Sequence, residues 1–158
     1  MARVFVTGSA QGLGRSAALS LLDDGHQVVV HARDPQRVGT LADLADRGAT
    51  VVVGDLASVE HTRHLAEQVN KLGRMDVVIH NAGVYGESRR NPGPEGHPRT
   101  LAVNILAPYL LTGLIERPDR LIYLTSDMHV AGDDSLNDLD WTTRRSIGTQ
   151  AYCDFTQP

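Results

Sequence analysis

Short apolar runs alternate with longer segments of mixed polarity along the chain. Five runs are almost continuously apolar and lie at residues 4–6, 28–30, 51–53, 77–79 and 121–124. Short runs without polar alternation are typical of strands that are buried on both faces of a parallel sheet. The pattern therefore predicts five short strands of this kind.

The segments between these runs carry helix signals. The first repeats apolar residues at helical spacing and ends near Gly25, a residue type that favours helix C-termini. The second begins at Pro35, because proline prefers the first helical turn, and the third begins after Ser58, a good N-cap residue. A fourth helix is expected over about residues 96–113, with a kink or break at Pro108.

The repeated alternation of strand and helix predicts an α/β fold. We expect a doubly wound, Rossmann-type parallel sheet of about five strands with right-handed crossovers. The 158 residues suit a single domain spanning residues 1–158. Ligands of such sheets bind beyond the carboxyl ends of the strands, so residues that directly follow the apolar runs are the candidates for a site.

A glycine-rich turn, Thr-Gly-Ser-Ala-Gln-Gly-Leu-Gly, follows the first apolar run at residues 7–14. Its glycines allow a tight turn and a close approach of backbone N–H groups to a pyrophosphate. The N-terminus of the helix that follows adds a partial positive charge toward the anion. The alternative is a tight strand-to-helix turn that binds nothing.

This turn resembles the Thr-Gly-x-x-x-Gly-x-Gly motif of the short-chain dehydrogenase/reductase family. Further matches follow in the family's order: an acidic residue, Asp55, after the third strand, and His80 with residues 81–83 after the fourth, where the family has Asn-Asn-Ala-Gly. Asn104 in the fourth helix and Ser126 after the fifth strand match the family's active-site Asn and Ser.

The resemblance implies that the first half of the chain binds a nicotinamide dinucleotide. The residues that it assigns to cofactor binding are Gly8, Ser9, Gln11, Gly12, Leu13, Gly14, Arg33, Asp55, Leu56, Asn81, Ala82 and Gly83. It implies hydride transfer between this cofactor and a small carbonyl or alcohol substrate. No metal ion is expected from the residues themselves. His61 and His64 share a helix face, but no further ligands complete a metal site.

The end of the second strand favours NADP over NAD. Ala32 stands where family members that prefer NAD usually carry an aspartate, and Arg33 follows it. A guanidinium can bind the 2′-phosphate of NADP through paired hydrogen bonds, whereas a carboxylate suits the ribose 2′-OH of NAD. Asp34 could take that acidic role or cap the next helix, and Gln11 stands where many NADP-dependent relatives have a second basic residue.

The proton-transfer residue implied by the resemblance is Tyr152. The family pairs this tyrosine with a lysine four residues later, because a nearby ammonium lowers a phenol pKa that is otherwise about 10. The long polar insert between Ser126 and Tyr152 resembles the retinol-dehydrogenase-like branch. Thr156 occupies the lysine position, and the sequence ends at Pro158, which indicates a C-terminally incomplete domain.

Two functions follow from this pattern. The first is a short-chain dehydrogenase/reductase with catalytic Asn104, Ser126 and Tyr152, whose activity is impaired because the lysine and the family's C-terminal strands are missing. The second is a catalytically inactive nucleotide-binding or interaction module. A natural truncation, a frameshift and a cloned fragment are all consistent with the sequence. The fifth strand would then be a sheet edge, so we expect self-association through this edge or through the fourth helix.

Composition narrows the partners. The formal net charge of −4 argues against a nucleic-acid footprint and against adhesion to an anionic membrane surface. The single cysteine cannot form an internal disulfide, and no segment has the apolar length of a membrane span. These features favour a cytoplasmic location.

Overall fold

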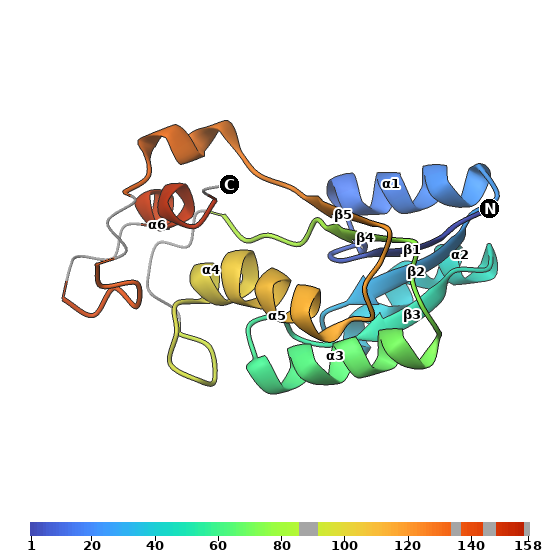
Figure 1. Ribbon diagram of the computed structural model, residues 1–158, viewed down its shortest axis with the longest axis horizontal. Coiled ribbons are helices and arrows are strands. Elements are labelled where there is room, and N and C mark those ends of the chain that lie inside the picture. Colours follow the sequence, from blue (N-terminus) through green and yellow to red (C-terminus); the bar gives the residue numbers. More distant parts are fainter. Residues whose placement is uncertain (86–91, 134–136, 144–147, 157–158) are drawn as a thin grey trace.

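The computed structural model describes residues 1–85, 92–133, 137–143 and 148–156, and contains a five-stranded parallel sheet (Figure 1). Its strands are β1 (Arg3–Val6), β2 (Gln27–Ala32), β3 (Thr50–Val53), β4 (Val77–His80) and β5 (Arg120–Tyr123). The order β3-β2-β1-β4-β5 reverses between β1 and β4. The five predicted strands and the doubly wound, Rossmann-type fold are confirmed. The expected burial on both faces is wrong for β5, because it is an edge strand and all four of its residues are exposed.

Helices cover both faces of the sheet (Figure 1). The α-helices are α1 (Gly12–Asp23), α2 (Ala42–Asp46), α3 (Val59–Lys71), α4 (Arg99–Leu101), α5 (Ala107–Leu114) and α6 (Gly148–Asp154). Side-chain caps are present at two of the helix starts predicted from the sequence, one of a 3-10 helix and one of an α-helix. Asp34 accepts a hydrogen bond from the Arg37 N–H at the start of a 3-10 helix, Pro35–Leu41, that leads into α2. Ser58 accepts one from the His61 N–H at the start of α3.

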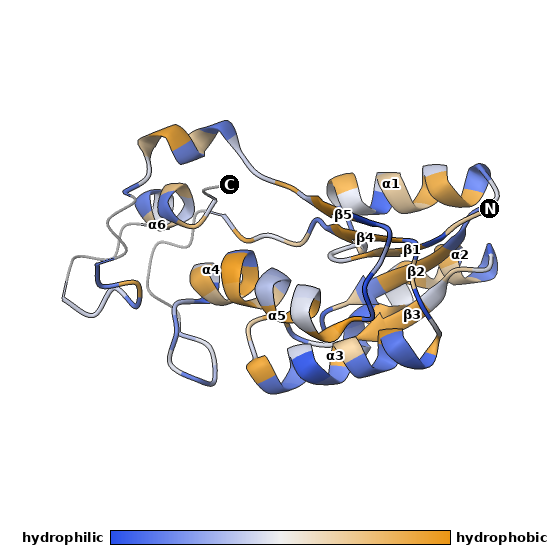
Figure 2. Cartoon of the chain, in the orientation of Figure 1, coloured by the Kyte–Doolittle hydropathy of each residue, from blue (hydrophilic) through white to orange (hydrophobic). Residues whose placement is uncertain are grey.

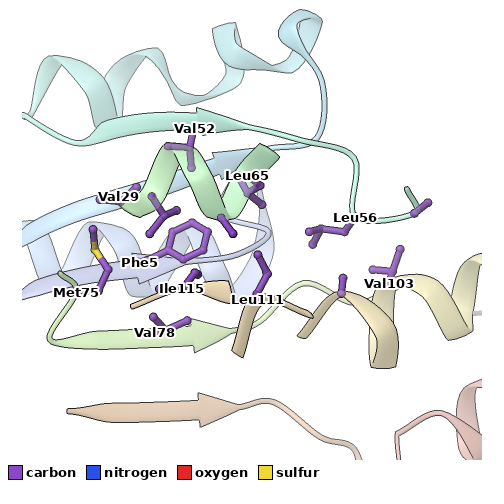
Figure 3. Close-up of a cluster of buried hydrophobic side chains, with 14 residues drawn as sticks. Phe5, Val29, Val52, Leu56, Leu65, Met75, Val78, Val103, Leu111 and Ile115 are labelled. Atoms are coloured by element: carbon purple, nitrogen blue, oxygen red, sulfur yellow. The ribbon is translucent and has the colours of Figure 1, made fainter. Parts of the chain in front are cut away.

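The apolar core is divided by the sheet into two clusters. On one face Phe5, fully buried, packs among side chains of α3 and α5, including Leu65 and Leu111 (Figure 3). On the other face Val4 and Val6 pack against α1 and the segment leading into α2. Neighbouring strand residues thus face opposite clusters, and Figure 2 shows the apolar strands beside α3, most of whose residues are polar. This arrangement explains why the strand runs lack polar alternation.

The fourth predicted helix differs from expectation. It begins at Arg99 rather than near residue 96, and it continues past Pro108 to Leu114. Between α4 and α5, residues Ala102–Leu106 form a π-helical turn in which the Ala107 N–H reaches the Ala102 carbonyl. Because proline donates no backbone hydrogen bond, a wide turn just before it lets the helix continue without a sharp break.

A third apolar cluster fixes the C-terminal segment. Trp141, which is 5% exposed, packs with Leu101, Ala151 and Phe155, and so joins α6 to α4. β5 is an edge strand of the sheet, and its residues Leu121, Ile122 and Tyr123, with Leu124 just after it, are 37–51% exposed. Among the described residues, no helix combines the length and the apolar character that a membrane crossing needs.

Candidate functional site

An open cleft of about 840 Å³ lies beyond the carboxyl ends of the strands, where a doubly wound sheet is expected to bind its ligand. Its wall is formed by the glycine-rich turn, the segments that follow β2, β3 and β4, the π-helical turn and α6. The predicted site residues that line it are Gly8, Gln11, Gly12, Leu13, Arg33, Asp55, Leu56, Asn81, Ala82, Gly83, Asn104 and Tyr152. The structure therefore brings together most of the residues selected from the sequence.

Three predicted residues lie outside the cleft wall: Ser9, Gly14 and Ser126. Ser9 is fully buried, and its hydroxyl donates to the Val6 carbonyl while it accepts the His31 N–H at 3.1 Å. Gly14 is buried in α1 against the Asn81 amide and the Gly8 carbonyl. These two residues shape the turn from behind instead of facing a ligand.

The segment after β4 holds the glycine-rich turn in place. The Thr7 hydroxyl accepts the N–H groups of Asn81 and Ala82, each at 3.0 Å. In return the Asn81 side-chain amide donates to the carbonyls of Thr7 at 2.9 Å and of Gly8 at 3.3 Å. Gly8 itself has φ +68°, a left-handed conformation that glycine adopts without strain. Asn81, just after the neighbouring strand β4, thus holds the glycine-rich turn in place.

His31 on β2 is a cleft residue that the sequence did not single out. The Gly8 N–H donates to its Nδ1 at 3.0 Å, so its Nε2 carries the proton and donates to the Gly54 carbonyl at 2.7 Å. Burial lowers the pKa of His31, although the Gly54 hydrogen bond and the charge of Asp55 oppose the shift. The only available signal was one polar side chain at the end of an apolar run.

Two arginines line the cleft after β2: Arg33, as predicted, and Arg37, which the sequence reasoning missed. Asp34 lies between them. One of its carboxylate oxygens accepts the Arg37 N–H at 3.0 Å, and the other accepts from Arg33 Nε at 3.2 Å. Of the two roles left open for Asp34, the structure shows the helix cap. The basic character of this end of the cleft comes from the two guanidinium groups.

His80 replaces the first asparagine of the family motif and belongs to a compact polar cluster. Its ring stacks on Tyr123, with centroids 4.7 Å apart, and its Nε2 lies 3.3 Å from the Thr112 hydroxyl. That hydroxyl donates its one proton to the Pro108 carbonyl, so His80 and the Tyr123 hydroxyl, at 2.6 Å, are the donors toward it. Burial lowers the pKa of His80 to about 4.

Asn104 and Tyr152 face the cleft from two different helical segments. Asn104 lies in the π-helical turn, where its side chain accepts the Val84 N–H at 2.9 Å and donates to the Val84 carbonyl at 3.2 Å. Tyr152 on α6 meets Tyr85 edge to face, with ring centroids 4.8 Å apart. Both residues are thereby held by the segment that follows β4.

Ser126, the third predicted catalytic residue, does not line the cleft. The Ser126 hydroxyl accepts the Met128 N–H at 3.3 Å and caps a 3-10 helix, Asp127–Ala131. Its neighbour Thr125 lines the cleft instead and donates to the Thr156 carbonyl at 2.6 Å. Thr156 also lines the cleft, at the position one turn after Tyr152, and donates to the Tyr152 carbonyl at 2.8 Å.

In the part of the chain that the structure describes, no three His, Cys, Asp or Glu side chains converge on a potential metal site.

The sequence resembles known proteins over most of its length. Residues 2–117 match the model of a protein family described as short chain dehydrogenase. The short-chain dehydrogenase chyC of Penicillium rubens is 42% identical over 158 residues, covering 98% of this chain and 60% of chyC. Retinol dehydrogenase 13 of Homo sapiens is 33% identical over 165 residues, covering 95% of this chain and 49% of that enzyme.

The fold agrees as well. The crystal structure of an uncharacterized protein from Mycobacterium paratuberculosis superposes with a TM-score of 0.85 at 27% identity, over 99% of this chain and 57% of that one. The chain thus spans 60% or less of the length of these three proteins. The profile match, the relatives and the clamped glycine-rich turn all point to one family, and the chain belongs to the short-chain dehydrogenases.

Proposed function

We propose that the cleft binds NADP(H) and that the protein descends from, or works as, an oxidoreductase of carbonyl or alcohol substrates. The observation that carries this proposal is the cleft itself, which combines a clamped glycine-rich turn with two arginines at the end of β2. A volume of about 840 Å³ is in the range of small-molecule and cofactor sites. A nicotinamide bound there would supply or accept the hydride.

The residues of the chain suit the parts of such a cofactor. N–H groups in the first turn of α1, which begins at Gly12, have no acceptor within the helix and can bind a pyrophosphate. Arg33 and Arg37 suit a 2′-phosphate. Asp55 and Leu56 also line the cleft, which supports their proposed place beside the adenine ring.

Replacing Arg33 with alanine tests the preference for NADP. We expect the affinity for NADPH to fall by roughly 10–100-fold, because a charge-assisted contact to the 2′-phosphate is lost, while the affinity for NADH changes little. Titration of both cofactors by fluorescence measures this directly. Arg47→Ala is the matched control, since Arg47 pairs with Asp23 on the surface and does not line the cleft. Equal losses for NADPH and NADH would contradict the assignment.

For the reaction we propose the family roles for the catalytic residues. Tyr152 transfers the proton, Ser126 binds the substrate oxygen and Asn104 holds the water and backbone of a proton relay. Asn104 and Tyr152 line the cleft, which supports this proposal. A cofactor-binding module without turnover is the second candidate. Two observations favour it: Thr156 replaces the lysine, and Ser126 lies outside the cleft wall.

These candidates differ in one measurement. A threonine hydroxyl carries no charge that could lower the pKa of a nearby phenol, so we expect the 158-residue chain to bind NADPH without oxidising it above background in the presence of carbonyl substrates. Absorbance of the reduced nicotinamide follows the reaction. Turnover that Tyr152→Phe abolishes would refute the inactive module and support the enzyme.

We also propose a cytoplasmic location and self-association. The buried, unpaired Cys153 supports a reducing compartment. The exposed apolar side chains of β5, or the helical segment that carries Tyr109 (75% exposed), would form the contact between copies. Sedimentation of the chain as a monomer at all concentrations would exclude the self-association.

A further inference from the structure

His31 is a buried imidazole that joins three segments of the chain near the cofactor cleft. It is 4% exposed and lies near the end of β2. Its Nδ1 accepts the Gly8 N–H at 3.0 Å, and its Nε2 donates to the carbonyl of Gly54 after β3 at 2.7 Å. Its own N–H donates to the Ser9 hydroxyl at 3.1 Å. Both ring nitrogens are therefore engaged by backbone groups outside β2.

The Gly8 contact requires a neutral ring. A backbone N–H can only donate, so Nδ1 must present its lone pair, and the single ring proton resides on Nε2. In a protonated imidazole Nδ1 also carries a hydrogen. The Nδ1–H and the Gly8 N–H would then point at each other, and the hydrogen bond between them would be lost. The position therefore selects one tautomer of the neutral form.

The two polar backbone groups of Gly8 are held by different residues. His31 accepts the Gly8 N–H, and the Asn81 side chain, just after the neighbouring strand β4, donates to the Gly8 carbonyl at 3.3 Å. Gly8 has φ +68°, so a residue in a left-handed conformation is fixed at both polar groups. The motif shared with the family includes Asn81, whereas His31 lies outside the residues that carry the resemblance.

We propose that His31 is a positioning residue for cofactor binding: through Nδ1 it fixes the Gly8 N–H and with it the shape of the glycine-rich turn that receives the pyrophosphate. The proposal rests on the proposed function, because it assumes that the cleft binds a dinucleotide. His31 acts on the ligand through Gly8 and Ser9, which anchor the turn to β2.

The proposal gives cofactor binding a defined pH dependence. Burial lowers the pKa of His31 below its usual 6.5, and the carboxylate of Asp55 after β3 opposes that shift. The affinity should thus be constant at neutral pH and fall only below that usual value, when the ring protonates. His80, which also lines the cleft, has a pKa of about 4 and remains neutral over most of this range.

Two substitutions separate the two nitrogens of the ring. In His31→Asn the amide oxygen can occupy the place of Nδ1 and accept the Gly8 N–H, while His31→Gln can reach Gly54 as Nε2 does but leaves Gly8 without its acceptor. We expect NADP⁺ to bind His31→Asn about as tightly as the wild type at neutral pH, and His31→Gln on the order of 10-fold more weakly, because a buried donor is left unpaired.

The pH profile provides the second readout. Protonation of the ligand phosphates affects the wild type and every variant equally. The ratio of the wild-type Kd to that of His31→Asn therefore reports only the effect of His31 protonation on cofactor binding. We expect this ratio to be constant near about pH 8 and to rise only once the pH falls below the lowered pKa of the buried His31 ring. Urea unfolding of each variant at the same pH values reports any general loss of stability.

The Gly8 amide gives an assay that needs no cofactor. In the free wild-type chain its NMR shift should titrate together with the His31 ring, and it should stop titrating in His31→Asn. A wild-type chain that binds no dinucleotide but shows this coupling would overturn the proposed function and leave the positioning contact in place. A wild-type chain that binds, with His31→Gln equal to His31→Asn and a Kd ratio that stays flat through the pH at which the His31 ring protonates, would overturn the role of His31 alone.

Discussion

Gly8→Ala is expected to destabilise the protein by about 3 kcal/mol and to abolish cofactor binding. A Cβ on Gly8 would lie 2.9 Å from the Ala82 Cα and 3.1 Å from its Cβ, and φ is +68° at this position. Ala82 cannot retreat freely, because its N–H is bonded to the Thr7 hydroxyl at 3.0 Å. Strain and overlap therefore add. Urea unfolding and NADPH titration measure the two losses.

Gly12→Ala is the matched control. Gly12 has φ +60°, yet a Cβ there would meet no atom within 4 Å. Only the backbone strain remains, which corresponds to about 1–2 kcal/mol. If the two variants lost the same stability, the close contact between Gly8 and Ala82 would contribute nothing to the stability of the fold.

The fold could be predicted because its signal is local. The predicted strands are short apolar runs that lack polar alternation, and in β1 Phe5 shows why: its neighbours Val4 and Val6 face one cluster while it faces the other. Burial on both faces imposes the apolar run directly. The caps at Asp34 and Ser58 are likewise local, since each side chain bonds a backbone N–H three residues later.

The parts of the site that escaped prediction depend on contacts between distant segments. His31 is an ordinary strand residue by pattern, and its function appears only when β2 lies beside the glycine-rich turn. Ser9 and Gly14 fit the family motif, but the structure uses them inside the turn. The π-helical turn at Asn104 also has no sequence period of its own, because it arises where the helix must accommodate Pro108.

His80 makes the stability of the fold depend on pH. Burial lowers its pKa from 6.5 to about 4, so the neutral ring is favoured in the folded state. The corresponding stability is fully present above pH 6.5, the unfolded value, and is lost as the pH falls through that value toward 4. Between about pH 7.5 and pH 4.5 we expect His80 alone to remove about 2–3 kcal/mol from the free energy of unfolding.

His80→Gln isolates this contribution. The glutamine amide can replace Nε2 as a donor to the Thr112 hydroxyl, and it does not titrate. The difference between wild type and variant should therefore grow on acidification, although carboxylates and His31 titrate in both proteins. Urea unfolding at the two pH values gives the four free energies required. Parallel losses in wild type and variant would show that His80 protonates without cost. Its stacking on Tyr123 and its contact with Thr112 would then not require the neutral ring.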